Sequence, residues 1–413
     1  MAYRPLKTVF HQHDAKTVDH EHRFRLQLPS TLRFAYPVGE NDLFVVVTRE
    51  LATKMEQVWR NELRLAELWI QLPGAARHHY VYSLLIDEIQ ASNQIENIHS
   101  TRHEIGEALE AARRNNGSGI ARKRFQEMAS AYMALFQSGA PVKLPDTLRD
   151  VRELYDSLLG DEIGEDDILD GELFRKSPVS IYDYGSAEPV HRGATDEAEI
   201  SQRLGTMLQI HDLYDGPELA LAFIEHFMLE HTHPFYDGNG RFGRFLLALR
   251  LGNLLSTPTA LSLSSGIMKE KSAYYAAFIN AEHPMNRGEG TFFVEAMVQT
   301  LLHAQEERLV FLTQKSDELR RLAEVCKAWQ DDNPEDLTHY EQQTLFLLGQ
   351  VHLLGPRSGA SWDEIANYQE RSKQTVRPAL DSLEGRGLIE RLSAKPLVVR
   401  LAEAGQTLLG LDS

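Results

Sequence analysis

The sequence has very little cysteine and no long apolar segment, and both absences restrict what the protein can be. Its single cysteine, Cys326, excludes an internal disulfide framework and any metal site built on several thiolates. No run of about 18 apolar residues occurs, so no segment is predicted to span a membrane. The N-terminal stretch MAYRPLKTVFHQHDAKTVDH lacks the apolar segment of a signal peptide. We therefore expect a cytoplasmic protein with no membrane partner.

Positive charge is also scarce. The chain has 43 Lys and Arg against 60 Asp and Glu, a net charge of −17 over 413 residues. This balance excludes a protein whose whole surface binds nucleic acid or anionic lipid, although a local basic patch stays open. Apolar residues make up 42% and charged residues 25%, which is typical of a soluble globular protein. At this length two or three domains are expected.

What the sequence does contain is mostly helical periodicity. Residues 1–54 are expected to form an N-terminal extension, largely extended, with one short strand at FVVV. Apolar residues then recur at helical spacing through a core predicted at 55–329. Helices are expected at about 52–73, 77–97, 101–115, 196–213, 217–231, from 239 onward and at 292–329, with two more before residue 160. Residues 173–193 break this rhythm and predict a short β-hairpin.

The C-terminal part has a different pattern after an acidic linker predicted at 330–338. Three short helices followed by two strands in residues 339–413 are the outline of a winged helix, with Ser361 and Glu364 in capping-box spacing. Its third helix offers candidate DNA contacts: Lys373, Gln374, Thr375 and Arg377, with a weaker candidate in the Lys395-Pro396 turn. Residues 337–413 carry eight basic and nine acidic side chains, however, so a protein partner is an equal alternative.

The most informative stretch is HTHPFYDGNGRFGR, residues 231–244. Gly238 and Gly240 free the backbone so that consecutive N–H groups can converge, and a helix predicted to begin near Asn239 adds unpaired N–H groups. Together these groups form an anion cradle. Arg241 and Arg244, three residues apart on the first turn of that helix, suit an oligophosphate.

Two side chains before the cradle add chemistry to it. Asp237 could hold Mg²⁺, which favours carboxylate and phosphate oxygens. His233 lies four residues earlier and could act as a general base. The set predicts a nucleotide-transfer site. The alternatives are a plain turn between helices with solvated arginines and a metal site built on His231, His233 and Asp237.

The segment HPFYDGNGRFGR resembles the signature of the Fic family, H-x-F-x-[DE]-G-N-G-R-x-x-R, at every defined position. The resemblance extends in outline over residues 55–310. It implies a mostly α fold: a helical bundle of the Fic type with a β-hairpin flap, here followed by the winged helix-turn-helix. It also implies an enzyme that transfers AMP from ATP to a hydroxyl of a target protein and releases pyrophosphate.

The resemblance further implies a role for each motif residue. His233 would deprotonate a Ser, Thr or Tyr hydroxyl, Asp237 would bind Mg²⁺, and Phe235 would anchor the loop. Phosphate contacts would come from Gly238, Asn239, Gly240, Arg241 and Arg244, the last of these to the γ-phosphate. The hairpin at Val179–Ile181 would present a target strand by β-augmentation, and Tyr274 or Tyr275 would lie near the adenine unless both are core aromatics.

The sequence departs from the family at two places. Arg192-Gly193 stands where many relatives have two prolines after the flap, which affects the expected flap geometry. The asparagine that some relatives carry after the tyrosines has two counterparts here, Asn280 and Glu282. Neither departure touches the phosphate chemistry.

A second motif lies in ASNQIENIHS, residues 91–100. Ser92, Glu96 and Asn97 resemble the family's inhibitory motif [ST]-x-x-x-E-[GN], on a helix predicted at about 80–97. Glu96 would pair with Arg244 where the γ-phosphate should bind, or would be one solvated carboxylate among many. In relatives this glutamate can also support removal of AMP.

The sequence therefore predicts an autoinhibited, Mg²⁺-dependent protein adenylyltransferase that uses ATP and modifies a target protein or itself. A DNA-binding regulator with the Fic core as a sensor is the alternative from another class, and a Fic enzyme with a different donor is a third. A homodimer is left open.

Overall fold

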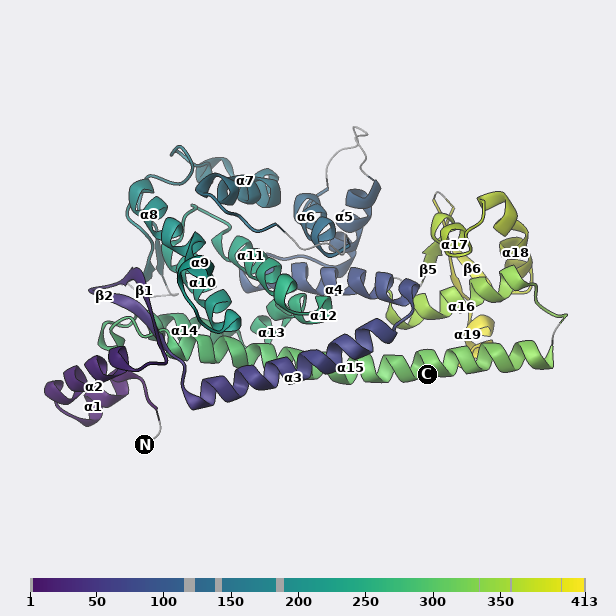
Figure 1. The fold of residues 1–413 in the computed structure, drawn as a ribbon. Coiled ribbons are helices and arrows are strands. Elements are labelled where there is room, and N and C mark those ends of the chain that lie inside the picture. Colours follow the sequence, from purple (N-terminus) through teal and green to yellow (C-terminus); the bar gives the residue numbers. More distant parts are fainter. Residues whose placement is uncertain are drawn as a thin grey trace. The chain divides into compact units, whose positions relative to one another are not determined.

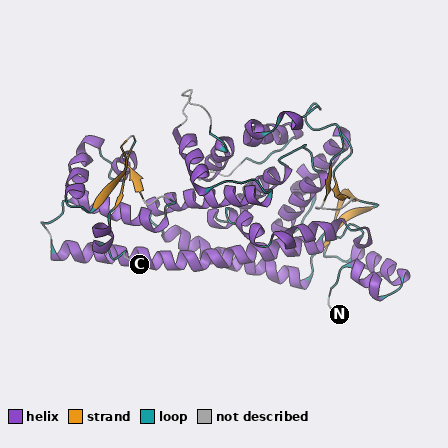
Figure 2. Cartoon of the chain, turned by 180° about the vertical axis from the view of Figure 1, so that it is seen from behind, coloured by secondary structure: helices purple, strands orange, loops and turns teal. Residues whose placement is uncertain are grey.

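The structure is a computed structural model that describes residues 3–114, 123–137, 143–182, 189–333, 335–356, 359–394 and 396–411. Within these ranges the chain is predominantly helical, and its strands form small two- and three-stranded sheets (Figures 1 and 2). The predicted mostly α fold is therefore confirmed. In the described part of the chain no helix combines the length and apolarity needed to cross a bilayer.

The chain divides into two compact units. Unit 1 consists of Met1–Leu63 and Asp87–Glu306, and unit 2 of Arg64–Ile86 and Glu307–Ser413. Three long helices contribute residues to both units: α3 (Arg49–Gln71), α4 (Gly74–Ile95) and α15 (Thr291–Asp332). Because α15 continues to Asp332, residues 330–332 of the predicted linker are helical. The predicted domain division stays a prediction.

The N-terminal residues differ from the expected extended lead-in. They form two helices and a hairpin, α1 (Leu6–Gln12), α2 (Ala15–Gln27), β1 (Thr31–Val38) and β2 (Asn41–Val46). Asp14 caps α2 by accepting a hydrogen bond from the Thr17 N–H. Leu6 and Val18 pack with two residues of β2 in a small core. The helices have few apolar residues of their own, which is why periodicity alone did not predict them.

The rest of unit 1 consists of short helices and one further hairpin. Its elements are α5 (Arg102–Arg114), α6 (Gln126–Gln137), α7 (Leu148–Leu159), η1 (Gly160–Glu162), η2 (Glu165–Asp167), β3 (Ser180–Tyr182), β4 (Pro189–Arg192), α8 (Glu197–Leu208), α9 (Ile210–Leu213), α10 (Glu218–Thr232), α11 (Asn239–Leu254), α12 (Thr257–Ala260), α13 (Leu263–Lys269), α14 (Lys271–Glu282) and η3 (Pro284–Asn286). Strands β3 and β4 pair antiparallel where the flap hairpin was predicted. The turn between them, residues 183–188, lies outside the described residues.

Helices α10 and α11 form the centre of unit 1 (Figure 1). Nearly every residue of α10 is buried, and so is most of α11. A helix that is apolar on all sides is stable only inside a folded core. The segment that connects these two helices is therefore held at both ends by the most constrained elements of the unit.

The C-terminal part of unit 2 has the element order expected from the sequence, with two additions. It contains α16 (His339–Leu354), β5 (Gly359–Ser361), α17 (Trp362–Tyr368), α18 (Lys373–Gly385), β6 (Ile389–Ala394), β7 (Leu397–Leu401) and α19 (Glu403–Leu408). The strands form one sheet in the order β5-β7-β6. The capping box of Ser361 and Glu364 is present at the start of α17. Strand β5 and helix α19 were not predicted.

Candidate functional site

The motif loop begins where α10 ends in an unusual backbone conformation. His233 has φ 53° and ψ 63°, in the left-handed region, and its N–H donates to the Leu229 carbonyl. Pro234 follows and cannot continue the helix. Gly238, with φ 78°, then precedes the first residue of α11. A left-handed conformation favours glycine, so its occurrence at His233 means that surrounding contacts hold this residue in place.

Contacts inside the loop fix its shape. The Asn239 side chain accepts from the Phe235 N–H at 2.9 Å and donates to the Phe235 carbonyl at 2.8 Å. The Phe235 ring is fully buried and stacks on Tyr155, with 3.6 Å between ring centroids. The Tyr155 hydroxyl donates to the Asp237 carbonyl at 2.9 Å. Phe235 thus lies where an anchor should, and the Asn239 side chain is engaged with the loop backbone. The phosphate contact of Asn239 stays a prediction.

Arg244 is buried at the site, and each of its three side-chain nitrogens contacts a residue at or just after the end of α4. Its Nη1 lies 2.8 Å from Glu96 Oε1, while Nε donates to Ser92 Oγ at 3.1 Å and Nη2 to the Ser92 carbonyl at 2.9 Å. Arg244 is 1% exposed and Glu96 is 32% exposed. The structure therefore places Glu96 against Arg244 as the sequence predicts, and it adds contacts from Ser92 that were not predicted.

The Glu96 carboxylate also lies inside the predicted anion cradle. A Cβ added at Gly240 would collide with Glu96 Oε1 and would lie 3.0 Å from Arg244 Nη1. The glycine thus leaves the space that a carboxylate oxygen occupies at the first turn of α11, where unpaired backbone N–H groups favour negative charge. Asn97, which follows Glu96, has φ 59°, and its side chain accepts from Lys271 Nζ at 3.0 Å.

Arg241 has different partners from Arg244. Its Nη1 lies 2.7 Å from Glu162 Oε2, and its Nη2 lies 3.5 Å from Asp237 Oδ2. Burial raises the pKa of Glu162, although Arg241 opposes that shift. Asp237 is about half exposed, and together with Lys123 these residues line a cavity of about 600 Å³. The arginines therefore hold separate carboxylates, and Glu162, a residue with no motif around it, was missed by sequence reasoning.

His233 is a neutral imidazole in this environment. Burial, followed by the nearby His191 and Arg175 side chains, lowers the pKa of His233 to about 3. The His191 ring on β4 lies 5.9 Å from the His233 ring, and its Nδ1 is 2.7 Å from Glu282 Oε2. A neutral imidazole can accept a proton, as a general base must.

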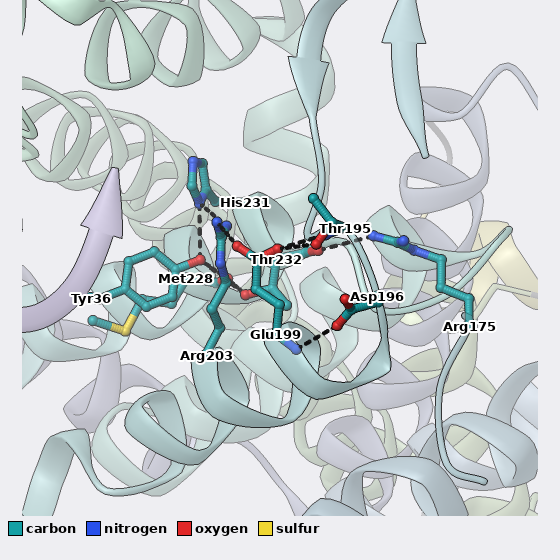
Figure 3. Close-up of polar contacts among 9 residues, drawn as sticks. All are labelled: Tyr36, Arg175, Thr195, Asp196, Glu199, Arg203, Met228, His231 and Thr232. Carbon is teal, nitrogen blue, oxygen red and sulfur yellow. Dashed lines mark hydrogen bonds and ion pairs between the residues drawn. The ribbon is translucent and has the colours of Figure 1, made fainter. Parts of the chain in front are cut away.

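His231 belongs to a different set of contacts, shown in Figure 3. Its Nδ1 lies 2.9 Å from the Tyr36 hydroxyl and 3.2 Å from Arg203 Nη1. The Tyr36 hydroxyl also donates to the Met228 carbonyl. In the described ranges no three His, Cys, Asp or Glu side chains are grouped so that they could hold a metal ion. This arrangement gives no support to the alternative metal site on His231, His233 and Asp237.

The two tyrosines proposed for the adenine occupy different positions. Tyr274 is buried, and its hydroxyl lies 2.9 Å from His226 Nε2, as in the core-aromatic alternative. Tyr275 is 39% exposed, and its hydroxyl donates to the Ile95 carbonyl at 3.4 Å. Tyr275 thus lies beside the end of α4, next to Glu96.

The predicted docking residues lie on two separate elements. Ile181 on β3 pairs with His191 on β4 and is 40% exposed, while Val179 accepts from the Gly193 N–H just outside the strands. In unit 2 the candidate DNA contacts on α18 are exposed: Lys373, Gln374, Thr375 and Arg377. Lys373 pairs with Asp363 and Arg377 with Asp381. Lys395 lies outside the described residues.

Glu230, on the last turn of α10, is a second carboxyl group near Arg244. Burial raises its pKa to about 8, and Arg244 acts in the opposite direction. The group is therefore largely protonated at neutral pH, which leaves Glu96 as the anion facing Arg244.

This state of Glu230 predicts a pH-dependent stability. The folded protein binds the proton more tightly than the unfolded chain, whose pKa is near 4.5. Stability is thus fully present below that value and is lost as pH rises through about 8, by on the order of 1.4 kcal/mol per pH unit. Chemical denaturation of Glu230→Gln, which mimics the protonated carboxyl, should show a flatter dependence between pH 5 and 8. An unchanged slope would mean that Glu230 is ionised in the folded protein.

Part of the chain that contains this site is similar to a described family. Residues 145–251 match the model of the Fic/DOC family. Over 105 residues the chain is 35% identical to "Protein adenylyltransferase Fic" of Drosophila grimshawi and 33% identical to the protein of that name from Drosophila ananassae. The matched region is 25% of this chain, and the chain spans about a fifth of the length of these relatives.

Two solved structures of Fic proteins also align with this chain, both with low sequence identity. A Fic family protein from Desulfovibrio desulfuricans G20 aligns with 86% of this chain and 97% of its own, with 19% identity and a TM-score of 0.49. A Fic domain protein from Bacteroides thetaiotaomicron covers 63% of this chain and 97% of its own, with 16% identity and a TM-score of 0.46.

Proposed function

We propose that this chain transfers AMP from ATP to a hydroxyl group of a protein, because residues 145–251 match the model of the Fic/DOC family. The observation that carries the proposal is the pairing at the start of α11. A buried arginine and a glycine-bounded space already hold a carboxylate there, Glu96, in the position where an anionic ligand would bind. Relatives that are 33–35% identical to this chain over 105 residues are named as protein adenylyltransferases.

In the proposed reaction His233 takes the proton of the target hydroxyl. The oxygen then bonds to the α-phosphorus of ATP, the bond from that phosphorus to the bridging oxygen breaks, and pyrophosphate leaves. The neutral state of His233 suits it for this role. Backbone N–H groups at Gly238–Gly240 would contact the phosphates, and Arg244 would contact the γ-phosphate once Glu96 has moved away.

The loop also fits a magnesium ion carried by the nucleotide. Mg²⁺ is commonly bound by one or two carboxylates together with phosphate oxygens, and the half-exposed Asp237 carboxylate at the cavity offers one such ligand. A bound Mg²⁺ would supply positive charge to the phosphates of ATP.

Asp237→Asn is therefore expected to raise the Mg²⁺ concentration for half-maximal ATP binding by about tenfold, since roughly 1.4 kcal/mol of ligand energy is lost. Titration of Mg²⁺ at fixed ATP, with nucleotide binding as the readout, measures this shift. Asp156→Asn, a change in the exposed partner of Arg152, is the control. Equal midpoints for the two variants would remove Asp237 as the ligand.

We propose in addition that α16 to β7 form a winged helix that contacts protein. Its cations are already paired on their own surface, Lys373 with Asp363 and Arg377 with Asp381, so a DNA phosphate would have to compete with these carboxylates. Sequence-selective DNA binding with a steep salt dependence and no AMP transfer would favour the regulator instead.

The proposed activity can be tested by mass spectrometry on the full chain carrying Glu96→Gly. After incubation with ATP and Mg²⁺, the chain or a protein of a cell lysate should gain the mass of one AMP on a Ser, Thr or Tyr side chain. A gain of one phosphate would instead identify a different transferred group.

A further inference from the structure

A buried arginine outside the motif donates hydrogen bonds to the backbone of the motif loop. Arg175, in the segment between η2 and β3, has no exposed surface. Its Nε donates to the His233 carbonyl at 2.8 Å and its Nη2 to the Thr232 carbonyl at 3.4 Å. Its backbone N–H donates to the Pro234 carbonyl at 3.4 Å. One residue thus contacts three consecutive carbonyls centred on His233, and Figure 3 shows its guanidinium directed at Thr232.

These contacts lie where the backbone is least favourable. The left-handed conformation of His233 costs about 1–2 kcal/mol for a residue other than glycine. Such a conformation persists only when neighbouring groups determine it. The Thr232 carbonyl also accepts from the Ala194 N–H at 3.0 Å, and the Thr232 hydroxyl is 2.9 Å from the Tyr36 hydroxyl. Among these groups that contact Thr232 and His233, Arg175 carries the positive charge.

Arg175 also connects the loop to the β3–β4 hairpin. Its Nη1 donates to the Ser177 carbonyl, just before β3. On the other side of the hairpin, a Cβ added at Gly193 would lie 2.7 Å from Arg175 Nη2 and 2.9 Å from His233 Cβ. Gly193 therefore allows the end of the hairpin to approach the guanidinium and His233 more closely than any other residue could. This contact gives a physical reason for the glycine that departs from the family's proline pair.

The hydrogen bonds of Arg175 position His233, and its positive charge affects the protonation of the His233 imidazole. Its carbonyl partners are neutral, and burial lowers the pKa of its guanidinium. The guanidinium in turn lowers the pKa of the His233 imidazole, which favours the unprotonated form.

We propose that Arg175 is a positioning residue that holds His233 in the orientation for proton abstraction and couples it to the hairpin. This inference rests on the proposed function, because the reaction is AMP transfer. It predicts that disturbing Arg175 lowers kcat without weakening ATP binding, since none of its contacts involves residues 238–244.

The test uses the full chain with Glu96→Gly as the parent. Arg175→Lys keeps a positive charge and the backbone contact with Pro234, but its single amino group cannot reproduce the side-chain hydrogen bonds to Thr232, His233 and Ser177. Gly193→Ala keeps Arg175 but places a methyl group against it. Arg25→Lys is the matched control, because Arg25 is a buried arginine of the same unit whose partners are Glu21, Glu289 and Tyr3. Thermal unfolding of all variants measures how much stability each substitution removes, and Arg25→Lys shows the loss expected when any buried arginine is replaced.

For Arg175→Lys and Gly193→Ala we expect kcat to fall by about 10- to 100-fold, the effect of misplacing a catalytic group by about 1 Å. The KM for ATP should stay within about threefold of the parent, and Arg25→Lys should retain the parent kcat. Equal losses of kcat in Arg175→Lys and Arg25→Lys, or an increase in KM alone, would overturn the proposal.

A second readout does not depend on the activity. The imidazole NMR signal of His233, identified by its disappearance in His233→Ala, should move or broaden in Arg175→Lys and Gly193→Ala but not in Arg25→Lys. An unmoved signal would overturn the positioning role even if transfer occurs. A moved signal in a parent that transfers nothing would leave the positioning in place and refute the proposed function instead.

Discussion

Replacing Glu96 with glycine is expected to raise the rate of AMP transfer at least tenfold. The Glu96 carboxylate lies 2.8 Å from Arg244 Nη1 and against Gly240, so it occupies the position proposed for the γ-phosphate. Breaking one partly buried ion pair of this kind corresponds to a few kcal/mol, and about 1.4 kcal/mol already changes an equilibrium tenfold. Initial rates with ATP and Mg²⁺ measure the effect.

Comparing Glu96→Gln with Glu96→Gly separates the effect of the negative charge at position 96 from the effect of the side-chain volume. Glu96→Gln removes the negative charge and keeps the side chain, so it should activate less than Glu96→Gly but more than the unchanged chain. If both variants turn over no faster than the unchanged chain, Glu96 does not restrain the enzyme. If only the glycine variant is faster, the side chain blocks the nucleotide by its size and not by its charge.

Replacing His233 with alanine should abolish transfer in the activated chain. Loss of a general base lowers rates by about 10²- to 10⁴-fold. The phosphate-binding groups proposed at 238–244 are untouched, so the dissociation constant for ATP should change by no more than about threefold. Rates and ATP affinity of Glu96→Gly with and without His233→Ala provide the comparison, and His20→Ala on exposed α2 is the control.

Adding His191→Ala to the His233→Ala variant tests whether His191 can also act as the general base. His191 is bonded to Glu282 at 2.7 Å and lies beside His233, so it is the residue that could act in place of His233. Activity that survives His233→Ala and disappears when His191→Ala is added would assign the base to His191.

The part of the site that the sequence predicts is the part encoded locally. Gly238, Gly240 and Arg244 lie within seven residues, and a turn followed by a helix start fixes their relative placement. Glu96 was predicted because a second short motif marks it. The packing of Phe235 follows from its apolar character.

The residues that sequence reasoning missed act through contacts between distant segments. Arg175 lies 58 positions from His233 in the chain, and Glu162 lies 79 positions from Arg241. Neither has a spacing or composition that distinguishes it from a surface residue. Tyr36 was missed for a similar reason, because residues 1–54 were expected to be an extension and not to reach Thr232. Only the tertiary structure brings such pairs together.

The arrangement of Arg241 and Arg244 shows the same limit. Their spacing predicts one shared face, and the structure places Arg241 on the first turn of α11 and Arg244 on the second. Their guanidiniums nevertheless hold Glu162 and Glu96 respectively, because carboxylates from η1 and α4 approach that turn from different elements. Helical spacing fixes the position of each Cβ atom. The position of the guanidinium at the end of a long side chain depends on the carboxylate that it contacts.

We propose that the loop between α10 and α11 binds ATP so that its α-phosphorus receives the target hydroxyl. The most direct test incubates the Glu96→Gly chain in parallel with ATP labelled at the α-phosphate and with ATP labelled at the γ-phosphate. We predict that protein becomes labelled from the α-phosphate only and that His233→Ala removes this label. Label transferred from the γ-phosphate, or α-label that persists without His233, would contradict the account.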